Sequence, residues 1–128
     1  LLEVGKTPVS QGEENRDKFY LYCRQNGLWP KEVAGLDPVR QREEFKPYCP
    51  IQNITKDYPP TLLLHGDADT DVPYEQSAMM AGTLARAGVD SALITIEGGP
   101  HGFDFDEDSA DSKRALDIVI SFLREHVK

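Results

Sequence analysis

The chain has 128 residues, a formal net charge of −8 and a sequence pI near 4.8. This length predicts one domain at most, with a modest core. The acidic balance argues against nucleic acid as a partner, because phosphate binding needs clustered Lys and Arg. No apolar run approaches the roughly 18 residues that a membrane span requires. The first residue is Leu1 rather than Met, and no signal-peptide pattern follows it, so we expect an excised piece or a processed product.

Cys23 and Cys49 are the only cysteines, and neither lies in a CxxC pattern or beside a histidine cluster. A disulfide framework or a zinc site is therefore not expected. Both residues are expected to act as small apolar side chains in a reduced chain. The sequence does not decide the cellular compartment, although the cytoplasm is favoured.

The first part of the chain, residues 1–57, is rich in proline and aromatic residues and predicts short helices joined by irregular segments. A capping box at Ser10–Glu13 predicts a helix that ends near Asn26–Gly27. Pro30 and Asp37–Pro38 are expected to begin two further short helices, because proline is tolerated at the first helical position. The aromatic side chains of this part are interpreted as local core, with a substrate pocket as the alternative: Phe19, Tyr20, Tyr22 and Trp29.

The second part, residues 58–128, has a regular pattern of strands and helices. Thr61–His65 and Ser91–Ile96 are short apolar runs and predict two buried strands. Tyr74–Ala87 is rich in alanine and methionine and is followed by Gly88, which predicts a helix with a C-terminal glycine. From about Asp108 to Val127 the apolar residues recur at helical spacing, namely Leu116, Val119, Ile120, Leu123 and Val127.

The order strand, helix, strand, helix predicts an α/β layer with parallel strands. Two parallel strands do not form a stable sheet by themselves, because each strand needs neighbours and both faces need cover. We therefore interpret the second part as the last portion of a larger sheet.

Polar residues follow both predicted strands. Asp67, Asp69 and Asp71 come after the first strand, and Gly98–Phe103, which includes His101, comes after the second. Ligands of open parallel sheets bind beyond the carboxyl ends of the strands, and adjacent strands place these loops side by side. A carboxylate bonded to a histidine ring N–H fixes the tautomer of that histidine and stabilises its protonated form.

The run YPPTLLLHGDADTDVPYEQS, followed by AGVDSALITIEGGPHGF, resembles the end of an α/β-hydrolase. The resemblance is strongest to the branch of prolyl-oligopeptidase-like enzymes and bacterial carboxylesterases, whose motifs are HGxxDxxVP and GxxHGF. It implies that Asp69 is the acid and His101 the base of a catalytic triad. It also implies that residues 1–57 form a lid-like insertion of short helices, followed by the C-terminal α/β portion of the hydrolase domain.

The chain departs from this family at the nucleophile. The fold carries its serine in a GxSxG elbow upstream of the acid, and no GxSxG occurs in the 128 residues. None of the six serines has the flanking glycines: Ser10, Ser77, Ser91, Ser109, Ser112 and Ser121. The chain as given is expected to be inactive, with its serine elsewhere in the full-length protein.

A metal site is the main alternative for the three aspartates. They match the opening of an EF-hand loop, but the sixth position, which should be glycine, is Val72, and the twelfth, which should be glutamate, is Ala78. No metal is therefore expected. Asp67 and Asp71 are interpreted as solvated acids near a helix N-terminus.

The two other histidines are not expected to bind a ligand. His65 is interpreted as a buried, hydrogen-bonded histidine, and His126 as a cation in the last turn of a helix.

Two classes of function are compatible with these features. The first is a fragment of a serine hydrolase that acts on a small carboxylic ester or, as the alternative, on a short peptide, without a cofactor. The second is a non-catalytic interaction module. An unpaired edge strand favours self-association, so a homodimer formed by element exchange is also expected as an alternative.

Overall fold

A computed structural model describes residues 18–20, 22, 23 and 25–127, and the chain divides into two compact units at Gln52 and Asn53. The division lies a few residues before the predicted one. The role of the first unit as a lid stays a prediction. In the described part of the chain, no helix is long and apolar enough to cross a bilayer.

The first unit consists of short helices. Residues 18–20, 22, 23 and 25 are helical, and Gly27 follows with φ of 63°. The predicted capping box at Ser10–Glu13 lies outside the described residues. Helix α2, Trp29–Ala34, has Pro30 in its first turn and ends at Gly35, whose φ is 70°. The glycine adopts the left-handed conformation because it has no Cβ.

The helix predicted to begin at Asp37–Pro38 begins later, at Arg42, so the predicted start is wrong. Residues 38–40 form a turn instead, in which Asp37 Oδ1 accepts the backbone N–H groups of Val39 and Arg40 at 2.9 and 3.0 Å. The Asp37 carbonyl also accepts the Gln41 N–H at 2.8 Å. The chain continues with helix α3, Arg42–Phe45, and the 3₁₀ turns η1, Lys46–Tyr48, and η2, Pro50–Gln52.

Phe19 and Trp29 are half-buried, in agreement with their interpretation as local core, whereas Tyr20 and Tyr22 are exposed, so the interpretation is wrong for these two. The Trp29 ring lies 6.1 Å from the Phe19 ring, edge to face, and 5.4 Å from the Tyr20 ring. Cys23 has no exposed surface, and its burial raises the pKa of its thiol.

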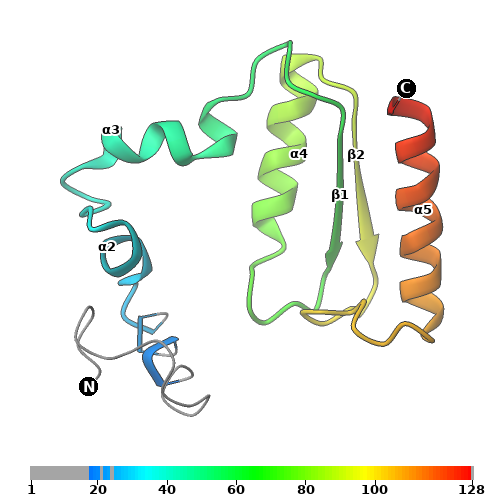
Figure 1. The fold of residues 1–128 in the computed structure, drawn as a ribbon, viewed down its shortest axis with the longest axis horizontal. Helices are drawn as coiled ribbons and strands as arrows, with labels where there is room; N and C mark the ends of the chain where they lie inside the picture. Colours follow the sequence, from blue (N-terminus) through cyan, green and yellow to red (C-terminus); the bar gives the residue numbers. More distant parts are fainter. Residues whose placement is uncertain (1–17, 21, 24, 128) are drawn as a thin grey trace. The chain divides into compact units, whose positions relative to one another are not determined.

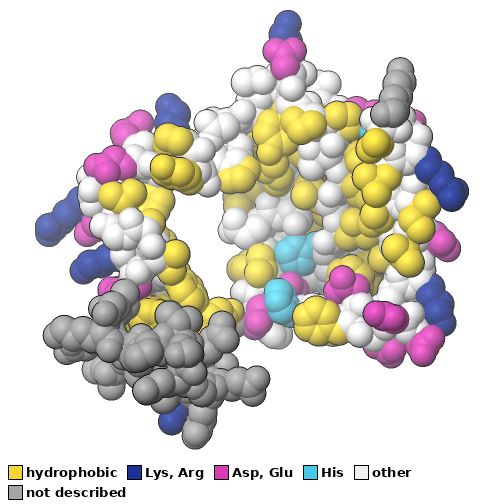
Figure 2. All heavy atoms as spheres, in the orientation of Figure 1, with side chains coloured by type: hydrophobic (Ala, Val, Ile, Leu, Met, Phe, Trp, Pro, Cys, Tyr) yellow, Lys and Arg dark blue, Asp and Glu magenta, His cyan; other side chains and the backbone are white. Residues whose placement is uncertain are grey.

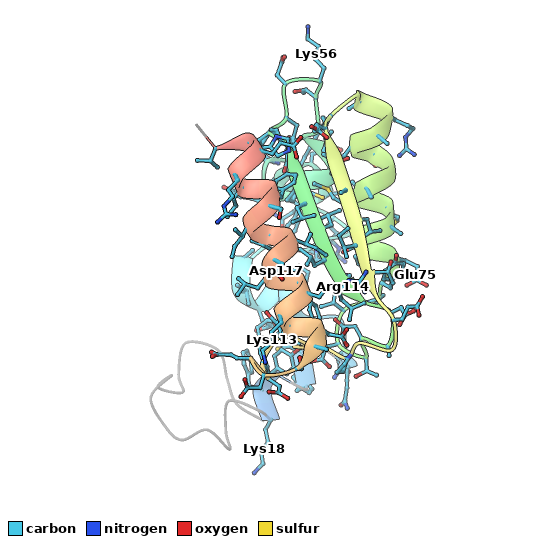
Figure 3. All side chains as sticks on the ribbon, turned by 90° about the vertical axis from the view of Figure 1, so that its right-hand side faces the viewer. Lys18, Lys56, Glu75, Lys113, Arg114 and Asp117 are labelled. Carbon is cyan, nitrogen blue, oxygen red and sulfur yellow. The ribbon has the colours of Figure 1, made fainter. Side chains whose placement is uncertain are left out.

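The second unit confirms the predicted strands and helices to within a residue or two. Strand β1, Thr61–Gly66, and strand β2, Ser91–Ile96, pair in parallel with Thr61 opposite Ser91. Helix α4, Glu75–Ala87, connects them, and helix α5, Ala110–His126, follows β2. The two helices lie on opposite sides of the two-stranded sheet (Figures 1 and 3).

The ends of these helices follow from local chemistry. Gly88 ends α4 in the left-handed conformation, with φ of 74°. Ser109 caps the N-terminus of α5, because its side-chain oxygen accepts the backbone N–H of Ser112 at 3.0 Å.

The core of the second unit is small, with Leu84, Val89, Ile96 and Ala115 as its buried apolar residues. The apolar stripe of α5 is largely uncovered in the described part of the chain, since Leu116 is 58% and Leu123 49% exposed. Hydrophobic side chains gather along α5 and beside the strands (Figure 2). Within the described residues the sheet has only two strands, so β1 has no second neighbour. These features agree with a portion of a larger sheet.

The ends of β1 and β2 lie unusually close together at two glycines. A Cβ atom added to Gly66 would overlap the backbone carbonyl of Gly99, and Gly99 is itself buried. The Ala68 N–H donates to this carbonyl at 3.1 Å. The loops that follow the two strands are therefore in direct backbone contact.

We expect Gly66→Ala to destabilise the protein by about 1–3 kcal/mol, the usual cost of forcing extra atoms into a packed site. The new methyl group would push the Gly99 loop away from β1. Chemical denaturation measures this loss. Gly82→Ala is the matched control, because a Cβ there meets only the Arg86 side chain at 3.5 Å. In mid-helix this change should stabilise by about 1 kcal/mol. Equal effects of the two substitutions would contradict the close approach.

Candidate active site

The loops after β1 and β2 are held together by backbone groups and one side chain. The Asp67 N–H donates to the Ile96 carbonyl at 3.2 Å, and the Gly98 N–H donates to Asp67 Oδ1 at 2.6 Å. Asp67 is exposed, yet its carboxylate ties one loop to the other. The prediction that it is exposed to solvent is confirmed, and its role in joining the loops was not predicted. The hydrogen bond depends on the close approach of two backbones, for which the sequence has no periodic signal.

The structure brings Asp69 and His101 into contact. The His101 Nδ1 atom lies 3.0 Å from Asp69 Oδ2. The Asp69 side chain is only 8% exposed, whereas that of His101 is 50% exposed. The expected juxtaposition of the two loops is thus confirmed. A carboxylate oxygen only accepts, so the histidine donates through Nδ1. In the neutral imidazole, Nε2 then carries the lone pair.

Backbone groups fix the other carboxylate oxygen. Asp69 Oδ1 accepts the N–H groups of Asp71 and Val72 at 2.7 and 2.9 Å. Burial raises the pKa of the Asp69 carboxyl, but the hydrogen bonds from Val72, His101 and Asp71 outweigh this effect. The pKa of Asp69 is therefore held well below its usual range. Asp69 is a carboxylate at neutral pH.

His65 is buried and hydrogen-bonded, as expected. Its ring nitrogens contact Ser77 Oγ at 2.6 Å and the Val72 carbonyl at 3.1 Å. Its Nε2 atom also lies 3.3 Å from Asp69 Oδ2. This link between His65, Ser77 and Asp69 was not predicted. Ser77 lies twelve residues after His65, on α4, and the two come together only because α4 returns along the sheet.

Asp71 and His126 differ in their relation to this site. Asp71 is half-buried rather than fully solvated, and its backbone N–H donates to Asp69. His126 lies outside the site in the last turn of α5, 3.8 Å from Asp90 and with its ring tilted against that of Phe122. Among the described residues, no group of three His, Cys, Asp or Glu side chains is arranged to hold a metal ion.

A cavity of about 1040 Å³ opens beside the Asp69–His101 pair. Polar groups from the loops line one part of it. The rest is formed by apolar side chains, including Leu64, Phe103, Leu116 and Val119. Sites for small molecules have this combination of an apolar wall and a few convergent polar groups.

We expect the stabilising effect of the Asp69 carboxylate to depend on pH. Its pKa in the folded protein lies below the value of about 3.9 in an unfolded chain. The stabilisation is therefore fully present above about pH 4 and is lost as the pH falls through the folded-state pKa. Urea denaturation of the wild type and of Asp69→Asn at pH 7 and pH 3 measures this, with the exposed Asp117→Asn as control. If the free energies of unfolding of the wild type and of Asp69→Asn differed as much at pH 3 as at pH 7, the assignment would be contradicted.

Comparison with known proteins assigns the chain to a family. The model of the prolyl oligopeptidase family matches residues 17–128. A non-reducing polyketide synthase from Aspergillus calidoustus is 35% identical over 117 residues, which are 80% of this chain and 5% of that protein. The esterase LipC of Mycobacterium tuberculosis is 35% identical over 66 residues, which are 51% of this chain and 16% of that protein.

Solved structures of esterases also resemble the chain. Esterase 2 of Thermogutta terrifontis, phosphoramylated by tabun, superimposes with a TM-score of 0.63 and 30% identity, over 77% of this chain and 35% of that chain. The same esterase is known phosphorylated by paraoxon. The chain thus spans about a third of that enzyme and a much smaller share of the curated relatives. With its parallel strands and flanking helices corresponding to the C-terminal portion of an α/β-hydrolase fold, the chain belongs to the prolyl oligopeptidase family.

Proposed function

We propose that Asp69 and His101 are the acid and base of a serine hydrolase that cleaves carboxylic esters. The nucleophilic serine would come from a part of the full-length protein outside these 128 residues. One observation carries the proposal, the 3.0 Å contact between His101 Nδ1 and the nearly buried Asp69 carboxylate. Family membership supports hydrolysis as the reaction class.

In this reaction the serine hydroxyl attacks the acyl carbon, and His101 Nε2 takes its proton. Asp69 holds the imidazole in the required tautomer and stabilises the imidazolium. His101 then returns the proton to the alcohol oxygen as the ester bond breaks, which leaves an acyl-enzyme. Water, activated by the same histidine, releases the acid and restores the serine. No cofactor takes part in these steps.

Small esters are favoured as substrates. The cavity beside His101 has an apolar wall that includes Leu64 and Phe103, which suits an acyl group. Similar solved proteins are described as esterases, which supports ester hydrolysis as the activity of this chain's full-length protein.

Peptide hydrolysis is the second candidate, because the matching family model is named for prolyl oligopeptidases. Esters and amides pass through the same acyl-enzyme, so Asp69 and His101 would have the same roles. A comparison of kcat/KM for a short p-nitrophenyl ester and for a proline p-nitroanilide decides between the two.

A non-catalytic interaction module, and a homodimer formed by element exchange, stay predictions. The feature that supports them is β1, which has no second neighbour among the described residues. Light scattering of the chain by itself distinguishes a monomer from a dimer.

In the full-length protein, we expect Asp69→Asn to lower kcat for a p-nitrophenyl ester by about 10⁴, because the histidine is then held in the wrong tautomer. His101→Ala should remove the proton transfer altogether. Steady-state kinetics measures both. Asp67→Asn is the matched control, since the amide oxygen can still accept the Gly98 N–H, and its activity should stay near that of the wild type. Equal losses at Asp67, Asp69 and Asp71 would indicate a shared metal site instead.

The position of the nucleophile is tested by covalent labelling. Paraoxon phosphorylates the similar esterase 2, so we expect it to label one serine of the full-length protein and to abolish hydrolysis. Mass spectrometry of the labelled peptides should place that serine outside residues 1–128. Labelling at Ser77, or at any other serine of this chain, would contradict the proposal.

A further inference from the structure

We propose that His65 is a positioning residue for the Asp69–His101 pair, and that Ser77 holds His65 in the ring tautomer that this task requires. The inference rests on the proposed function of Asp69 and His101. It assigns a role to a histidine and a serine that the triad itself does not use.

The contacts of His65 determine where its proton lies. The Nε2 atom is 3.1 Å from the Val72 carbonyl oxygen, and this oxygen can only accept a hydrogen bond. Nε2 therefore carries a hydrogen. In the neutral ring, Nδ1 is then an acceptor, and the Ser77 hydroxyl 2.6 Å away donates to it. The neutral Nε2–H form thus satisfies both ring nitrogens.

The ring of His65 is also restrained in its orientation. Its side chain is only 9% exposed. The Tyr74 ring meets it edge to face, with centroids 5.6 Å apart. The Tyr74 hydroxyl is in turn 2.5 Å from Thr95 Oγ1 on β2. His65 is therefore fixed by contacts to α4, to the loop after β1 and, through Tyr74, to the second strand.

The consequence for Asp69 is that each of its oxygens has two N–H groups within reach. Oδ1 accepts the N–H groups of Asp71 and Val72. Oδ2 is 3.0 Å from His101 Nδ1 and 3.3 Å from His65 Nε2. His65 Nε2 donates its hydrogen to the Val72 carbonyl and contacts Asp69 Oδ2, so it touches both ends of the tight turn from Asp69 to Val72. His65 therefore holds this turn, whose N–H groups fix Oδ1, and lies against the oxygen that faces His101.

Ser77, His65 and Asp69 share the residue types of a second triad, but their geometry favours support over catalysis. The Nε2–H of His65 is donated to the Val72 carbonyl, and the ring is enclosed rather than open to a substrate. Ser77 is half-buried within helix α4, where its neighbours are Gln76 and Ala78 rather than the glycines of an elbow. We therefore assign Ser77 to holding His65.

The test uses the full-length protein and the p-nitrophenyl ester assay. We expect Ser77→Ala to lower kcat about fivefold, the equivalent of one neutral hydrogen bond, with KM nearly unchanged. Ser77→Thr keeps the hydroxyl and should restore kcat. Ser121→Ala is the matched control, because its hydroxyl bonds only the Asp117 carbonyl one turn earlier on α5. A Ser77→Ala enzyme with wild-type kcat, or a loss confined to KM, would overturn the inference.

A double-mutant cycle separates positioning from a general loss of stability. His65→Gln should lower kcat by roughly 10- to 100-fold, as expected for a displaced catalytic group. In the Asp69→Asn background the same change should have little further effect, because His65 acts through Asp69. If the factors by which His65→Gln and Asp69→Asn lower kcat multiplied in full in the double mutant, His65 would support only the fold. This result would overturn the inference. His126→Gln is the control for replacing a histidine distant from this site.

The tautomer of His65 provides a readout that does not depend on turnover. Nitrogen NMR of histidine-labelled protein should show His65 protonated at Nε2 and not at Nδ1. Protonation at Nδ1 would overturn the inference while the proposed function stands. A full-length protein without hydrolase activity would instead overturn the proposed function, together with the role of His65 that rests on it.

Discussion

The parallel pairing of β1 with β2 is the constraint on which the site depends. Because the strands run side by side with Gly66 opposite Ile96, their carboxyl ends are at the same edge of the sheet. The loops that leave this edge carry Asp69 and His101. The absence of a side chain at Gly66 then lets the Gly99 backbone approach it directly. A bulkier residue at that point would move the loop of Asp69 away from the loop of His101.

Asp69 and His101 differ in their exposure to solvent. Asp69 is enclosed and accepts N–H groups at both carboxylate oxygens, whereas the side chain of His101 is half exposed. The fold thus fixes the Asp69 carboxylate in advance. In the proposed reaction, electrostatic preorganisation of this kind does not have to be created during catalysis.

Much of this arrangement could be predicted from the sequence. Strong local signals set the elements of the second unit, such as the apolar run Thr61–Leu64 and the glycine at Gly88, and the parallel order then implied that Asp69 and His101 meet. Contacts that leave no periodic pattern in the sequence could not be predicted from it. The bond from Gly98 to Asp67 and the bond between His65 and Ser77 arise from tertiary approach. The helix predicted at Pro38 begins later, at Arg42, after a turn that the side chain and carbonyl of Asp37 hold.

The hydrogen bonds that orient Asp69 come from Asp71, Val72 and His101. The position of this carboxylate is therefore encoded in the segment from Asp69 to His101 itself. The matched relatives, of which the corresponding segment is 5% in one case and 16% in another, contain this segment in chains of very different length.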